Sequence, residues 1–144
     1  MTTETRRLRE LTVRYAVKRD DEGRPVRIGR TLTTPRESAA VLMPLLQHEP
    51  SEVFAVLFLS TRHSVLAYHE VGRGTLDTVL VTPREVFKAA ILANAAAVIL
   101  CHSHPSGDPT PSPDDVALTR RLAAAGTLLG IEVLTTSSSP TTLT

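Results

Sequence analysis

A short apolar run followed by two closely spaced histidines constrains this chain more than any other stretch. Residues 95–100 (Ala-Ala-Ala-Val-Ile-Leu) are small, apolar or β-branched, and they are too few for a separate helix. They predict a strand buried on both faces. His102 and His104 follow this strand two residues apart, and side chains at that spacing point the same way. The stretch therefore predicts two imidazoles that can grip one metal ion.

A helix is predicted to begin shortly after the two histidines. The loop between His104 and this helix is rich in Pro and Gly. It ends at Ser112-Pro113, a favoured N-cap followed by a favoured first helical residue. Asp115 then lies in the first helical turn, where its carboxylate can face back toward the imidazoles. Two imidazoles and one carboxylate are the ligand set of a catalytic zinc site with a fourth position left for water. His102, His104 and Asp115 are the predicted zinc ligands.

Simpler interpretations of the same residues compete with a metal site. A histidine is commonly a surface or satisfied core residue, and Ser112 with Asp115 fits a helix cap that also compensates the helix dipole. The spacing of all four residues in one loop between packed elements favours metal ligation over these alternatives. Cys101 should point to the opposite face of the strand and into the core, with a thiol ligand as the minor alternative.

The metal motif and its surroundings resemble a known family. His102-x-His104, Ser112 and Asp115 resemble the JAMM (MPN+) metalloprotease signature, and the string from His102 to Asp115 resembles its bacterial RadC-like branch. The similarity covers about residues 35 to 134 and includes the stretches 74–76, 83–90 and 118–122. Ser103 is a local departure, because that branch usually has Asn between the two histidines.

The resemblance implies a fold, a cofactor and a base. The fold is α/β, a three-layer α/β/α sandwich with a central mixed sheet of the JAB/MPN, cytidine-deaminase-like type, and the cofactor is Zn²⁺. Glu52 is by itself only a polar residue at a strand edge, but JAMM proteins place their catalytic Glu at the start of the strand that follows the first helix. Glu52 is therefore the predicted base, with Glu49 and Glu70 as alternatives, and Ser112 is expected to stabilise the tetrahedral oxyanion.

Three segments are predicted along the chain. Residues 1–34 form a charge-rich N-terminal extension with two short strands, the first over residues 11–17, and without the helix-hairpin-helix region of full-length RadC proteins. Residues 35–134 form the RadC-like JAB/JAMM domain, in which capping-box patterns at Thr34 and Thr82 begin helices and Pro44 kinks or shortens the first. The Ser/Thr-rich residues 135–144 are expected to be disordered. Alternating strands and helices independently favour a layered α/β sandwich.

Charge and composition limit the classes of function that this chain can have. A net charge of +1 is no electrostatic signature of a nucleic-acid binder, and no apolar stretch is long enough for a membrane span or a signal peptide, so a cytoplasmic protein is expected. The predicted activity is that of a zinc-dependent peptidase or isopeptidase acting on a peptide, an isopeptide or a small conjugate. A DNA-repair-associated role, which the RadC resemblance brings with it, and a catalytically silent interaction module are the alternatives. A deaminase is not favoured, because the Pro-Cys-x-x-Cys ligand pair is absent from the sequence.

Overall fold

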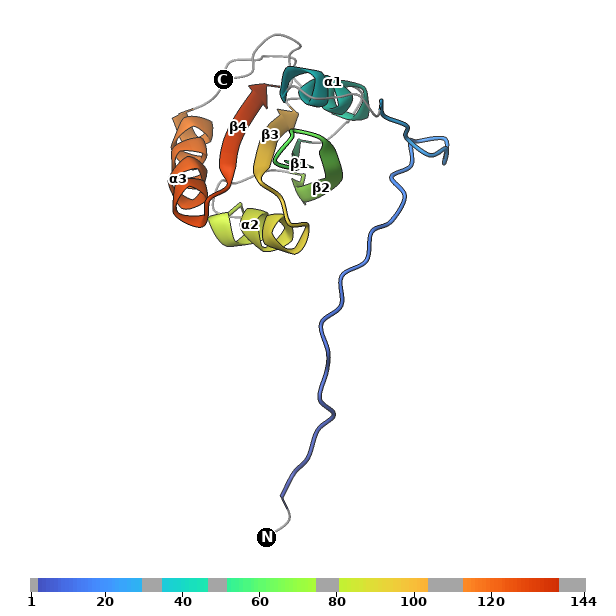
Figure 1. Ribbon diagram of the computed structural model, residues 1–144, viewed down its shortest axis with the longest axis vertical. Coiled ribbons are helices and arrows are strands. Elements are labelled where there is room, and N and C mark those ends of the chain that lie inside the picture. The colour runs from blue at the N-terminus through green and yellow to red at the C-terminus, as the bar shows by residue number, and fades with distance from the viewer. Residues whose placement is uncertain (1–2, 30–34, 47–51, 75–80, 104–112, 138–144) are drawn as a thin grey trace.

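The computed structural model describes residues 3–29, 35–46, 52–74, 81–103 and 113–137 (Figure 1). Helices and strands alternate along these ranges, which confirms the predicted α/β class. No helix among the described residues is long and apolar enough to cross a bilayer. The elements in chain order are α1 (Pro35–Leu46), β1 (Val53–Leu59), β2 (Val65–Arg73), α2 (Pro83–Leu92), β3 (Ala97–Ser103), α3 (Pro113–Leu129) and β4 (Glu132–Ser137).

The strands form one mixed sheet in the order β2-β1-β3-β4. β1 is antiparallel to both β2 and β3, whereas β3 and β4 are parallel. All seven residues of β1 are buried, as expected for a strand that is apolar on both faces and lies between two other strands. The predicted central mixed sheet is therefore confirmed, and β2 and β4 are its two edges.

Helices cover both faces of the sheet. On one face, Leu46 of α1 packs with alternate residues of β1 and β3 such as Leu57 and Cys101. On the other face, Phe87 of α2 and Leu122 of α3 belong to a second cluster, built on Phe54, Val56, Phe58, Val98 and Leu100. Figure 1 shows α1 on one side of the sheet and α2 and α3 on the other, which confirms the three-layer α/β/α sandwich.

The predicted helix starts are observed where the structure describes them. Thr82 is the N-cap of α2, and its side-chain oxygen accepts a hydrogen bond from the Glu85 amide at 3.4 Å, with Pro83 in the first turn. α1 begins at Pro35 and continues to Leu46, so Pro44 does not end it. The shortening expected at this proline is therefore not observed.

α3 and β4 approach each other closely through a glycine. A Cβ atom at Gly126 would overlap the carbonyl oxygen of Ile131 and lie 2.7 Å from Val133 Cγ2, so a larger residue would push the helix off the strand. α3 ends before Gly130, whose φ of 74° is readily adopted only by glycine, as is common at helix ends. β4 then extends to Ser137, which corrects the expected disorder of residues 135–137, because parallel pairing with β3 satisfies their backbone.

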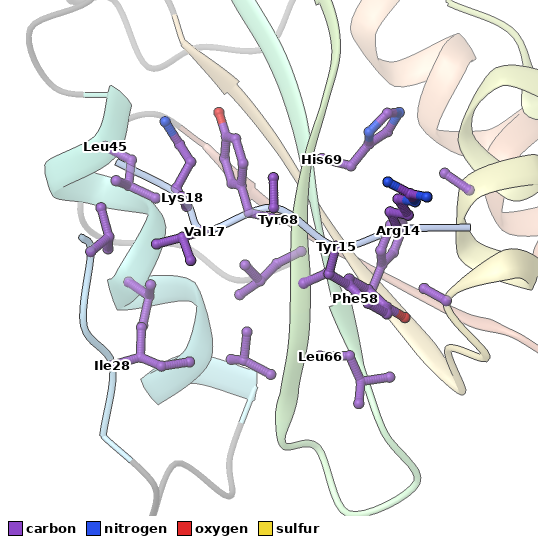
Figure 2. Close-up of a pocket in the computed structure, with 18 of the residues that line it drawn as sticks. Arg14, Tyr15, Val17, Lys18, Ile28, Leu45, Phe58, Leu66, Tyr68 and His69 are labelled. Atoms are coloured by element: carbon purple, nitrogen blue, oxygen red, sulfur yellow. The ribbon is translucent and has the colours of Figure 1, made fainter. Parts of the chain in front are cut away.

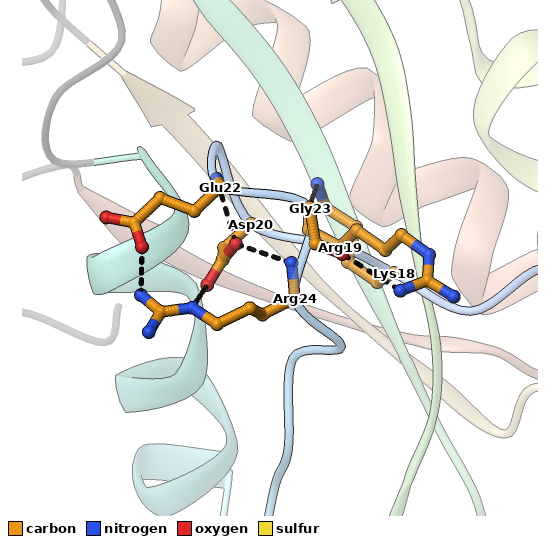
Figure 3. Close-up of polar contacts among 6 residues, drawn as sticks. All are labelled: Lys18, Arg19, Asp20, Glu22, Gly23 and Arg24. Atoms are coloured by element: carbon orange, nitrogen blue, oxygen red, sulfur yellow. Dashed lines mark hydrogen bonds and ion pairs between the residues drawn. The ribbon is translucent and has the colours of Figure 1, made fainter.

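The N-terminal segment forms less structure than predicted. Among residues 3–29, the structure has one isolated antiparallel bridge, between Arg19 and Pro25, in place of the two expected strands. The turn between them is ordered by Asp20, whose carboxylate accepts hydrogen bonds from the amides of Glu22 and Arg24 (Figure 3). The Arg24 amide is also the main reason that the pKa of Asp20 lies below its ordinary value. Without a neighbouring strand, two short extended pieces are not enough to make a stable sheet.

Candidate metal centre

His102 lies within β3, close to the strand's carboxyl end. The strand extends to Ser103, three residues beyond the predicted run. The antiparallel register places Phe54 of β1 beside His102, and the centres of the two rings are 5.9 Å apart. The imidazole is thus oriented by an aromatic neighbour from the most deeply buried strand, on the sheet face that α2 and α3 cover.

Asp115 approaches this imidazole from the first turn of α3. Its Oδ1 lies 3.3 Å from His102 Nδ1, and the two side chains are 17% and 19% exposed for His102 and Asp115, respectively. Nε2 of the same ring is buried. The predicted convergence of a strand-end histidine with a helix-start carboxylate is therefore present in the structure.

The separation of these two atoms fits a shared metal ion. Two ligand atoms at about 2.0–2.1 Å from one tetrahedral zinc ion lie about 3.3 Å apart. Direct N–H···O hydrogen bonds are shorter, most often about 2.9–3.0 Å. His102 Nδ1 and Asp115 Oδ1 lie 3.3 Å apart and are ligand types that zinc accepts, so the pair fits two of the three protein ligands of an open zinc site.

Cys101 lies on the opposite face of the sheet from His102. It belongs to the core cluster beneath α1, and its side chain is buried. Burial raises the pKa of the Cys101 thiol to about 12. The predicted core position is confirmed, on the sheet face away from the His102 ring.

Glu52 lies at the same end of the sheet as His102. It immediately precedes Val53, which pairs with Ser103 at the end of β3, and its carbonyl accepts a hydrogen bond from the Gly74 amide at 2.9 Å. Because side chains alternate along an extended chain, Glu52 shares a face with Phe54, the residue that contacts His102. Its position is compatible with the predicted base.

The alternative bases are less well placed or not described. Glu70 lies on β2 and forms a 2.6 Å ion pair with Arg73, with β1 between its strand and the strand of His102. Glu49 lies outside the described residues. Of the three glutamates considered, Glu52 is thus the one that the structure places at the end of β1 next to β3.

Part of the predicted site falls outside the described ranges. His104 and Ser112 lie in residues 104–112, so their roles as ligand and oxyanion donor stay predictions. His48 is likewise not described. Across the part of the chain that the structure does describe, no three His, Cys, Asp or Glu side chains gather in a group suited to a metal ion. The third ligand therefore depends on His104.

The other described histidines, His63 and His69, lie away from this centre. His63 faces Glu132, with Nε2 and Oε2 4.0 Å apart, near the turn that joins β1 to β2. His69 of β2 stacks on Phe58, and burial, followed by the nearby Lys88 ammonium, lowers its pKa. No local sequence signal predicts the contact between Phe54 and the His102 ring, because that contact depends on the β1/β3 register.

A mixed-sheet α/β/α sandwich with a His–Asp pair at the carboxyl end of a central strand has the arrangement of a JAB/MPN-type domain. The comparison with known families agrees: residues 32–136 match the family described as RadC-like JAB domain. The chain belongs to this family.

Proteins from several organisms are similar to this chain in sequence. The UPF0758 protein of Desulforudis audaxviator is 45% identical over 125 residues, which are 87% of this chain and 54% of that protein. The UPF0758 protein of Pseudomonas fluorescens is 53% identical over 93 residues, or 65% of this chain and 42% of that protein. That of Methanosarcina acetivorans is 41% identical over 105 residues, or 73% and 46%. The chain thus spans about half the length of the curated relatives it matches.

Proposed function

We propose that this protein is a zinc-dependent hydrolase of the JAMM type that cleaves a peptide or isopeptide bond. The observation that carries the proposal is the 3.3 Å separation of His102 Nδ1 and Asp115 Oδ1 at the end of β3. An imidazole and a carboxylate, delivered by different elements, fit a tetrahedral zinc ion at this distance. The family match supports the fold on which such a site is built.

In this proposal, His102, His104 and Asp115 hold the metal ion. Bound zinc supplies a Lewis acid that polarises a carbonyl and lowers the pKa of water. Phe54 keeps the His102 ring in place, and the start of α3 keeps the Asp115 carboxylate opposite it. Because their main-chain positions are set by a buried strand and a packed helix, the two ligands are held before the ion arrives.

Glu52 is proposed as the general base. It comes after α1 in the chain and directly precedes a fully buried strand, so its backbone is held at the end of the sheet while its half-buried side chain can exchange protons. It would accept a proton from the attacking water and pass it to the leaving amine, which departs as the carbon–nitrogen bond breaks. The Ser112 hydroxyl would donate to the oxyanion of the tetrahedral intermediate.

Metal content tests the ligand assignment. We expect about one zinc ion per purified chain by elemental analysis, lost in Asp115→Ala and in the double variant His102→Ala/His104→Ala. Asp114→Ala is the matched control, since it removes a carboxylate from the neighbouring position, and it should keep its zinc. Folded wild-type protein that binds no zinc after the ion is added back would favour the catalytically silent interaction module instead.

A second experiment separates the base from the ligands. Glu52→Gln should keep full zinc content and lose turnover by about 10²-fold or more on fluorogenic peptides and isopeptide-linked substrates. Glu70→Gln, which removes a carboxylate from a different strand, should retain both properties. Unchanged turnover in Glu52→Gln would show that another group serves as the base.

A further inference from the structure

The outer edge of β2 is open to a further strand. β2 ends the sheet on one side, and no strand among the described residues pairs with its outer edge. Leu66 on this strand is 40% exposed, although it is a large apolar residue. An edge of this kind presents a row of backbone groups that can pair with a further strand.

The two helical layers extend beyond this edge. A groove of ≈ 610 Å³ runs along β2 and is also lined by Val41 and Leu45 of α1 and by Ala89 and Leu92 of α2 (Figure 2). Apolar side chains from both layers thus flank the place where a fifth strand would lie. A strand added there would continue the sheet and cover apolar surface on both sides.

The N-terminal segment has the pattern of such a strand. Leu11, Val13, Tyr15 and Val17 alternate with more polar residues, as in a strand with one apolar face. Their exposed fractions are 81%, 47%, 64% and 63%, so this apolar stripe stays largely exposed although its residues 13–17 line the groove. A continuous exposed stripe of large apolar side chains is typical of an interaction surface.

The segment does not pair with the edge of its own domain. Lys18 contacts β2, because its Nζ lies 5.2 Å from the centre of the Tyr68 ring. The Arg19–Pro25 bridge begins at the next residue. From this point residues 13–17 line the groove but cross β2 rather than run beside it (Figure 2), and they form no backbone ladder with it. The more N-terminal residues run away from the domain (Figure 1).

We propose that the segment Leu11–Val17 of a second copy of this chain occupies the groove and pairs with β2 as a fifth strand. Residues 3–17, when extended, reach roughly 50 Å at 3.3 Å per residue, which is enough to span to a neighbouring molecule. The exchange is reciprocal, so each copy gives one segment and receives one, and the dimer has two-fold symmetry. This proposal rests on the edge of the sheet opposite β4 and is independent of the metal centre.

Aspartate substitutions inside and outside the segment test this interface. Val13→Asp/Val17→Asp places charges on the apolar face of the proposed strand, whereas Thr3→Asp/Thr5→Asp places the same charges on the exposed part of the same arm, outside the groove. Sedimentation velocity should show twice the 15.6 kDa chain mass for the wild type and the control, and the single-chain mass for Val13→Asp/Val17→Asp. A monomeric wild type, or equal dimerisation of both variants, would overturn the proposal.

Cross-linking distinguishes pairing between copies from closure within one copy. Tyr15→Cys/Leu66→Cys chains, one batch labelled with ¹⁵N, are mixed, allowed to exchange and treated with a short bismaleimide. Cys101 should not compete, because it is buried. Linked peptides that combine a labelled and an unlabelled half are expected from a second-copy interface. Links found only within one isotope class would show that the segment closes on its own domain, and the proposal would be wrong.

Discussion

Two histidines lie against phenylalanines of β1 on the same face of the sheet, but they differ in ring orientation and in the charged groups beside them. The His69 ring stacks on Phe58 at 6.1 Å between ring centres and 22° between ring planes, and the His102 ring meets Phe54 at 5.9 Å and 52°. Among the charged groups near His69, which also include the Glu70 and Glu85 carboxylates, the Lys88 ammonium of α2 acts most strongly on its pKa, whereas the Asp115 carboxylate of α3 lies beside His102. Contact with a phenylalanine of β1 therefore does not by itself mark a histidine as a candidate metal ligand.

The difference shows which feature of the fold matters. A helix that begins beside the carboxyl end of a strand can present an acidic residue from its first turn, where the helix dipole favours negative charge. α3 begins in this way next to β3, whereas α2 brings two opposite charges near His69, Glu85 in its first turn and Lys88 one turn further along, and Lys88 has the larger effect on the pKa of His69. The two histidines therefore differ in the charged side chains that the neighbouring helix places beside each of them.

The largest expected effect comes from removing each imidazole in turn. His102→Ala should weaken zinc binding by more than about 100-fold, because loss of a direct ligand exceeds the usual cost of changing a ligand's supporting residue. His69→Ala should leave zinc affinity unchanged. Competition with a chromophoric chelator measures both, and equal affinity of the two variants would remove the distinction between the histidines.

The phenylalanines provide a smaller, matched test. Phe54→Leu and Phe58→Leu each shrink a buried side chain of β1, and each should lower the free energy of unfolding by about 1 kcal/mol. Only Phe54→Leu should also weaken zinc binding, by about tenfold, because it loosens the His102 ring. Urea unfolding and chelator competition together report the two effects, and parallel losses of zinc affinity would contradict the assigned role of Phe54.

A modest pH effect is expected at His69. Burial, and next the Lys88 charge, hold its folded-state pKa below the ordinary value of 6.5, so the unfolded chain binds more protons between those two pKa values. The stability contributed by neutral His69 is thus present above about pH 6.5 and is lost as the pH falls through the lowered pKa.

Removing the lysine charge should raise the pKa of His69 only part of the way. In Lys88→Met the pKa should move toward its ordinary value without reaching it, because burial, the larger cause, remains. An NMR titration of the imidazole measures the change, with Lys88→Arg as the control that keeps the positive charge. An unchanged pKa in Lys88→Met would show that the lysine does not act on this ring.

The smallest effect is expected one residue away from His102, on the other face of β3. Cys101→Ala should leave zinc content unchanged, because the thiol is buried beneath α1 and its pKa is raised to about 12. For the same reason, the thiol of the native protein should react with a disulfide reagent at pH 8 far more slowly than that of the unfolded chain. Loss of zinc from Cys101→Ala would return the thiol to the ligand set.

Local pattern was enough to predict much of the fold. The apolar run of β3, the capping sequence at Thr82 and the start of α3 at Pro113 each carry their own structural signal, because burial, capping and the fixed φ of proline depend mainly on the residue and its immediate neighbours. The pairing of His102 with Asp115 was likewise predictable, because one short loop joins β3 to α3 and few positions place a helix-start carboxylate near a strand-end imidazole.

The sequence by itself thus determined the α/β class, the central strand and the approach of Asp115 to His102. Only the tertiary structure decided that Phe54 lies beside His102, that Glu70 pairs with Arg73 away from the centre, and that β4 continues to Ser137. It also decided that residues 11–17, which alternate like a strand, form no strand pairing with the other described parts of their chain. The physical reason is common to all four: strand pairing joins residues far apart in sequence, and register and partner are set by the assembled sheet rather than by the residues' own propensities.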